Sequence, residues 1–294
     1  MANTINARDK ALIPPDSDHR VEEHEVSVNG GEITVRCMIR TPGRGRSNSL
    51  PLLVHYHGGG WMPGDFELDD IWLKQVCVKQ QISIVNVEYR LAPEYPYPTQ
   101  QEDSYVALKW KRLHRFRNLR WRQHLAGLVL RASDDPFFDG QPLTGQILQA
   151  PCIFNPDNIP DRYKAELRSM DMPLHPAFLN KSSVQWVLDL WKPDLNDDIT
   201  FPLLHPDHAN LPPAVVQVCD IDPLRDEGIL YERLLKEAGN KTRLHFYAGV
   251  PHGFFFTHSQ IKKSKQFVQN LKDGIRWLPL MPSTNWSRAL LGIG

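Results

Sequence analysis

Apolar residues fall into short runs that alternate along the chain with segments of helical spacing. Residues 50–56 and 82–87 are mainly apolar, which is typical of strands buried on both faces of a parallel sheet. Strands alternating with helices predict an α/β fold with a mostly parallel sheet flanked by helices. Further strands are expected at residues 146–150, 214–218 and 242–247, and helices at 68–79, 101–113, 228–238 and 264–278.

Two regions depart from this alternation. Residues 25–40 alternate polar and apolar positions around Asn29-Gly30-Gly31, which is a hairpin signal. Residues 155–211 are rich in Pro, Asp, Trp and Met and contain no clear strand, so we expect a mostly helical insertion above the sheet. We interpret it as a lid on a single domain spanning 1–294, with or without a contribution from an N-terminal arm, residues 1–24.

Composition narrows the class of protein. A chain of 294 residues, 41% hydrophobic and 23% charged, has the proportions of a globular protein with a sizeable core. The 34 basic and 34 acidic residues cancel, so no global charge favours nucleic acid. The absence of a membrane-length apolar run, of a signal-peptide pattern and of a peroxisomal C-terminal signal favours a cytoplasmic location. The four cysteines form no Cys-x-x-Cys pair, so we expect reduced thiols rather than zinc ligands.

A glycine-rich motif follows the strand expected at residues 50–56. The run from His55 to Trp61 reads His-Tyr-His-Gly-Gly-Gly-Trp. Glycines let the main chain approach a reacting carbonyl closely, so that backbone N–H groups can stabilise a tetrahedral oxyanion. A plain glycine-rich turn is the alternative interpretation.

Three more motifs follow in order. They are Val-Glu-Tyr-Arg-Leu-Ala-Pro-Glu at residues 87–94, Asp-Pro-Leu-Arg-Asp-Glu-Gly at 222–228 and Gly-Val-Pro-His-Gly-Phe at 249–254. With the glycine motif, they resemble the hormone-sensitive-lipase branch of the α/β hydrolases, and fungal carboxylesterases of that branch in particular. The resemblance runs from Leu50 to the last expected helix. It implies an α/β-hydrolase fold, a small-molecule ester as substrate or ligand, and no metal or organic cofactor.

The resemblance also implies residue roles. Gly58, Gly59 and Gly60 match the oxyanion hole, His252 the general base, and Asp222 the acid that orients it. A histidine suits the base because its ordinary pKa lies near neutrality. A carboxylate on its second ring nitrogen fixes the tautomer and stabilises the imidazolium.

These assignments have alternatives. Asp222 also suits a helix N-cap with Pro223 at the first helical position, and Asp220 or Asp226 is an alternative acid. His252 is otherwise an ordinary loop histidine. Four further histidines form two pairs with no completing acidic or thiol ligand, so we predict no metal site at His55 with His57 or at His205 with His208.

The nucleophile that the family uses is missing. It lies in Gly-x-Ser-x-Gly, a sharp strand-to-helix turn called the elbow, and this pattern occurs nowhere in the chain. Ser133 is the nearest candidate but has no flanking glycines. Residues 109–131 are basic and contain no acidic residue and no apolar run of the strand type. We therefore expect a central strand and the elbow to be truncated or absent.

This gap leaves two classes of function open. One is a carboxylic-ester hydrolase whose activity is impaired because the nucleophile is missing, through a wrong splice junction or decay of the gene copy. The other is a catalytically inactive protein that binds a small molecule in the same pocket. The sequence does not specify an oligomeric state. We expect a sheet that has lost a central strand to close around the gap or to fold poorly.

Aromatic residues bear on possible ligands. Phe116 and Trp121 among the arginines of residues 115–122 could contact nucleic acid, but the run is short and the remaining chain is neutral. Fungal relatives imply secondary metabolism by resemblance only. Apolar side chains of the expected lid favour small apolar or aromatic acyl esters: Met172, Phe178, Trp186 and Trp191.

Overall fold

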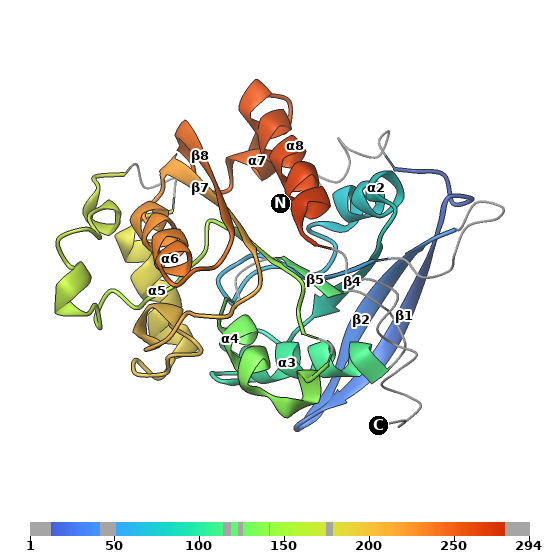
Figure 1. Cartoon of the computed structure of the whole chain (residues 1–294), viewed down its shortest axis with the longest axis horizontal. Coiled ribbons are helices and arrows are strands. Elements are labelled where there is room, and N and C mark those ends of the chain that lie inside the picture. Colours follow the sequence, from blue (N-terminus) through green and yellow to red (C-terminus); the bar gives the residue numbers. More distant parts are fainter. Residues whose placement is uncertain are drawn as a thin grey trace.

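The computed structural model describes residues 13–41, 51–113, 119–122, 126–140, 142–174 and 179–279. Strands run through the middle of the molecule, with α2 and α8 on one side and α3 and α4 on the other (Figure 1). The strands are β1 (His19–Val28), β2 (Gly31–Arg40), β3 (Leu52–Tyr56), β4 (Ser83–Glu88), β5 (Leu119–Arg122), β6 (Gln146–Gln149), β7 (Ala214–Ile221) and β8 (Thr242–Pro251). The α-helices are α2 (Asp70–Gln80), α3 (Thr99–Leu113), α4 (Ala126–Asp134), α5 (Lys181–Trp191), α6 (Arg225–Glu237), α7 (Phe254–Thr257) and α8 (Lys262–Trp277).

The strands form two hydrogen-bonded groups. One has the order β1-β2-β4-β3-β5 and the other the order β6-β7-β8. β1 and β2 make the expected antiparallel hairpin, with Val28 opposite Gly31. β3 pairs in parallel with β4 and β5, and β7 pairs in parallel with β6 and β8. The prediction of a mostly parallel sheet in an α/β fold is confirmed.

Side-chain alternation along the parallel strands builds a core on each face of the sheet. In β3, Leu53 packs in the cluster with α2 and α8, whereas Leu52 and Val54 pack in the larger cluster on the opposite face. Val215 and Val216 of β7 divide in the same way. Because successive side chains of a strand point to opposite faces, a strand covered on both faces must be apolar throughout. This explains why the sequence of these strands reads as a run rather than as an alternation.

Residues 109–131 contain a short strand, so the central strand that was expected to be truncated or absent is truncated and not absent. β5 pairs in parallel with β3, with Leu119 opposite Leu52 and Arg122 opposite His55. Its backbone satisfies hydrogen-bonding groups of β3 that would otherwise lie unpaired in the fold, and this requires no apolar side chain. β5 is nevertheless four residues long, against eight in β7. In the described part of the chain no ladder joins β5 to β6, so the sheet is interrupted beside the short strand. Residues 123–125, where an elbow would follow, lie outside the described residues.

In its described residues, the region expected to form the lid contains one α-helix and three short 3-10 turns. A capping box begins α5: the Asn180 side chain accepts a hydrogen bond from Ser183 N at 3.1 Å, and Ser183 Oγ accepts one from Asn180 N at 2.9 Å. Residues 19–24 of the expected N-terminal arm belong to β1, and residues 1–12 lie outside the described part. The three turns are η3 (Asp161–Tyr163), η4 (Ser169–Asp171) and η5 (Pro202–Leu204).

None of the described helices combines the length and the hydropathy needed to cross a bilayer.

Candidate active site

The glycine motif forms a tight loop after β3. Gly59 has a φ of +131°, and a Cβ atom built on it would lie 1.7 Å from the carbonyl oxygen of Pro63. Only glycine fits there, because a side chain at that φ is strained and the clash is with backbone. The next residues, Gly60 and Trp61, have φ values of +62° and +64°. The backbone conformation of the loop therefore depends on glycine, above all at Gly59.

The His57 side chain contacts this loop and supports it. Its Nδ1–H donates to the carbonyl oxygen of Gly58 at 2.9 Å, and its ring stacks on Tyr89 with centroids 4.4 Å apart. The Tyr89 hydroxyl donates to the His57 carbonyl oxygen at 2.8 Å. Burial lowers the pKa of His57 below its ordinary value. The ring therefore stays neutral at neutral pH and supports the loop structurally.

His55 lies deeper and is also structural. Its Nδ1–H donates to Asn86 Oδ1 at 2.8 Å, and its Nε2 lies 3.1 Å from Asp69 Oδ2. The His55 and Asp69 side chains are fully buried, and Asp69 also accepts a bond from Trp72. Among the described residues no group of three or more His, Cys, Asp or Glu side chains has the arrangement of a metal site.

The two residues predicted as acid and base lie side by side, although they are 30 positions apart. Asp222 follows β7 and His252 follows β8, and these strands are parallel neighbours, so their ends meet at one edge of the sheet. His252 Nδ1–H donates to Asp222 Oδ2 at 2.8 Å. Asp222 is 1% exposed, and its other oxygen accepts a bond from Leu224 N at 2.9 Å.

The pair sets the protonation of the imidazole. Burial disfavours the charged ring, but the adjacent Asp222 carboxylate outweighs burial, and the pKa of His252 is raised above its ordinary value. Nδ1 carries the proton toward Asp222, so Nε2 is the free acceptor of the neutral ring. The His252 side chain is 27% exposed. This is the arrangement of an oriented general base.

The alternative acids are occupied elsewhere. Asp220 accepts from Gly249 N at 2.8 Å, and Asp226 accepts from the backbone N–H groups of Arg168 and Ser169. The prediction of Asp222 as a helix N-cap is wrong, because α6 begins at Arg225; the Asp222 side chain caps the preceding turn instead.

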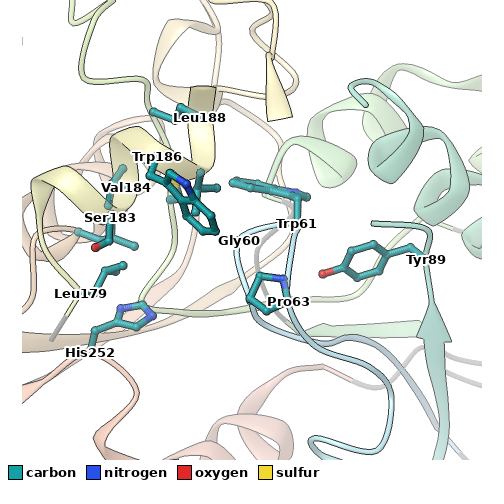
Figure 2. A pocket seen from close by; sticks show the side chains of 14 residues that line it. Gly60, Trp61, Pro63, Tyr89, Leu179, Ser183, Val184, Trp186, Leu188 and His252 are labelled. Carbon is teal, nitrogen blue, oxygen red and sulfur yellow. The ribbon is translucent and has the colours of Figure 1, made fainter. Parts of the chain in front are cut away.

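A cavity of about 310 Å³ lies between the glycine loop, His252 and α5 (Figure 2). That volume suits a small organic molecule. Trp61 stacks on the fully buried Trp191, with ring centroids 3.9 Å apart, and forms a rigid wall. Trp186 of α5 is 58% exposed and lies beside the cavity. The lining residues are Gly59, Gly60, Trp61, Pro63, Tyr89, Cys152, Leu179, Ser183, Val184, Trp186, Val187, Leu188, Leu224 and His252.

The four residues predicted from the sequence to belong to the lid differ in their relation to the cavity. Trp186 lines the cavity, and Trp191 supports it from behind Trp61. Met172 receives a hydrogen bond from Arg225 and is not among the lining residues, and Phe178 lies outside the described residues. Cys152 and Leu179 line the cavity without any signal in the sequence, because the fold alone brings them to it.

Two lining side chains carry potential nucleophiles, and neither is hydrogen-bonded to His252. Ser183 Oγ donates to Asn180 O at 2.8 Å as part of the helix cap. Cys152 Sγ lies 3.8 Å from Phe154 O, and burial raises the pKa of its thiol well above the ordinary value. Ser133 donates to Leu130 O on α4 and lines a different cavity. In the described residues, therefore, none of these three side chains is paired with the predicted base, His252.

Comparisons with known proteins cover most of the chain. A family described as "alpha/beta hydrolase fold" matches residues 53–256. The versiconal hemiacetal acetate esterase of Dothistroma septosporum is 31% identical, over 92% of this chain and 84% of that protein. The crystal structure of vibralactone cyclase is similar with a TM-score of 0.87 and 37% identity, over 94% and 84% of the two chains. The crystal structure of the thermostable carboxylesterase EstE1 from a metagenomic library has a TM-score of 0.75 and 25% identity. The match covers 94% of this chain and 95% of that chain.

Proposed function

Because the chain belongs to the α/β-hydrolase fold family, in its hormone-sensitive-lipase-type branch, we propose that it binds a small neutral ester and hydrolyses it slowly. One observation carries this proposal. The His252–Asp222 pair opens onto the same cavity as Gly59 and Gly60, so a base and oxyanion donors meet at one ligand site. The catalytic roles of these residues are part of the proposal.

Without the serine, water is the nucleophile of the proposed reaction. His252 Nε2 takes a proton from water while the water oxygen attacks the ester carbonyl carbon. The carbonyl π electrons move to oxygen, where the N–H groups of Gly59 and Gly60 stabilise the negative charge. The imidazolium, held by Asp222, then returns its proton to the leaving alkoxide, and an acid and an alcohol result. The reaction is slow because no covalent intermediate divides it into easier steps.

The first test measures release of p-nitrophenol from p-nitrophenyl acetate. We expect the rate to exceed that of buffer and His252→Gln to lower it by about 10²–10⁴-fold, the usual contribution of a general base. His258→Gln is the matched control, since the His258 side chain is exposed and, in the described hydrogen bonds, bonds only to Thr257. Equal rates for the native protein and His252→Gln would show that His252 is not the base.

A fluorophosphonate probe tests the proposed use of water. We expect no covalent labelling, because Ser183 is held in the helix cap and Cys152 is a protonated thiol. Labelling would identify a nucleophile by peptide mapping and would rule out the direct attack by water.

A second candidate function is binding without turnover. The observation that favours it is the absence of a nucleophile paired with His252 in the described residues, together with the absence of Gly-x-Ser-x-Gly from the chain. A rise in melting temperature with a short-chain aryl ketone, combined with no turnover that depends on His252, would support this candidate. Such a rise follows from mass action on the folded state.

The ligand class proposed is a short acyl ester of an apolar or aromatic alcohol. Trp61 and Trp186 supply flat apolar surface beside the glycine loop. A relative is named for an acetate ester, and it is a fungal protein. We therefore extend the proposal to acetate esters of fungal secondary metabolism.

A further inference from the structure

We propose that this site also catalyses enolisation, the reversible removal of a proton from the carbon next to a carbonyl, in neutral apolar ketones and β-keto esters. The proposal shares its base and its oxyanion donors with the proposed function, but it needs no ester bond and no nucleophile. The observation behind it is a proton acceptor and oxyanion donors that face one cavity, where no described hydroxyl or thiol is hydrogen-bonded to His252.

The oxyanion donors are available for a ligand. In the described residues, neither the Gly59 nor the Gly60 N–H donates to another backbone carbonyl. The sharp turn that separates them from such partners is enforced at Gly59, where any Cβ would meet the Pro63 carbonyl. Donors fixed in this way stabilise whatever oxyanion forms next to them, and an enolate oxygen is one.

The base faces the same space as these donors. Figure 2 places the His252 ring at one side of the cavity and Gly60 across from it. Its Nδ1–H is committed to Asp222, so Nε2 is the acceptor that remains for a proton of the ligand. In a serine hydrolase a hydroxyl would occupy this acceptor; here, Ser183 Oγ is bonded to Asn180 instead.

The proposed step is balanced in atoms and electrons. The C–H bond next to the carbonyl breaks, and its proton goes to His252 Nε2. Its electron pair forms a carbon–carbon double bond while the carbonyl π pair moves to oxygen, giving an enolate on the Gly59 and Gly60 N–H groups. Return of the proton from the imidazolium restores the ketone, so no oxidant, reductant or co-reactant is consumed.

The cavity lining selects for neutral substrates. Among the described residues, its lining includes no Asp, Glu, Lys or Arg side chain, and the pKa of Tyr89 is raised far above its ordinary value by burial. A carboxylate or phosphate would therefore be desolvated there without a counter-charge, which is costly. Trp61 and Trp186 instead offer apolar surface to an aryl or alkyl group.

The test follows proton exchange in a ketone that cannot be hydrolysed. Phenylacetone is incubated with the protein in D₂O, and loss of its benzylic proton signal is measured by NMR. The imidazolium exchanges its proton with solvent, so each enolisation delivers deuterium. We expect exchange about 10²-fold or more above that of an equal concentration of His252→Gln, the lower end of a general-base contribution.

Controls separate this result from a folding defect and from ester hydrolysis. His258→Gln reports any effect of surface imidazole, and thermal unfolding of His252→Gln verifies that it is folded. Equal exchange rates for the native protein and a folded His252→Gln would overturn the proposal, even if p-nitrophenyl acetate is cleaved. Exchange that depends on His252 would support it, even if no ester is cleaved.

Discussion

Two edges of the candidate site differ in how much of the family pattern they keep. On one edge, β7 and β8 are eight and ten residues long, are paired continuously up to Cys219, and carry Asp222 and His252 at their ends. On the other edge, β5 is four residues long, has no ladder to β6 in the described residues, and precedes a segment without Gly-x-Ser-x-Gly. The Asp222–His252 hydrogen bond therefore depends on two long parallel strands that fix its partners, and it forms although the chain has no Gly-x-Ser-x-Gly turn.

The glycine loop follows β3, and breaking it should lower turnover more than a change at Asp222. Gly59→Ala places a methyl group 1.7 Å from Pro63 O and displaces the oxyanion donors. We expect ester turnover to fall by about 10²–10³-fold, the usual loss of one donor. Turnover is measured with p-nitrophenyl acetate, and folding by circular dichroism.

Two further glycines are matched controls for Gly59→Ala. Gly60→Ala should be milder, because its Cβ would meet Val187 at 3.5 Å, an ordinary contact. Gly239 has a φ of +86° and open space around it, so Gly239→Ala carries the backbone strain without touching the site. If Gly239→Ala lowered turnover as strongly as Gly59→Ala, strain alone would account for the effect.

Removing the charge of Asp222, on the edge formed by β7 and β8, should shift the pH dependence of turnover. The base is the neutral imidazole, so the rate rises with pH through the pKa of His252, which Asp222 raises. Asp222→Asn removes that effect and leaves burial, which lowers the pKa, so the rising limb should move to lower pH. We also expect a loss of up to about 10²-fold at the plateau, because the tautomer is no longer fixed. A limb that stays in place in a full pH–rate profile would contradict the role of the pair.

Amide hydrogen exchange compares the two edges directly. In the described residues β5 is paired with β3 alone, whereas β7 is paired with β6 and β8. Local opening should therefore cost less in β5, and its amides should exchange about tenfold or more faster than those of Val216 to Val218. That ratio corresponds to about 1.4 kcal/mol. Equal protection, measured by mass spectrometry of peptides from both strands, would show that the interrupted ladder is no weaker.

Much of the fold was predictable because its strands are buried on both faces. The apolar runs at residues 50–56 and 82–87 correspond to β3 and β4, and the Asn29-Gly30-Gly31 break to the β1–β2 turn. β5 was missed because it lacks the apolar run that marks such strands. Its sequence, Leu-Arg-Trp-Arg, has no apolar run, and its strand conformation follows from the pairing edge that β3 offers.

The sequence by itself identified the residues predicted to carry the chemistry, Gly58 to Gly60, Asp222 and His252, and the lack of Gly-x-Ser-x-Gly. These were readable because each depends on a residue type in a local motif. The tertiary structure decided that His252 bonds Asp222 rather than Asp220 or Asp226, and that Cys152, Ser183 and Trp186 share its cavity. Such choices depend on strand order and helix packing, which join residues distant in the chain and leave no local pattern to read.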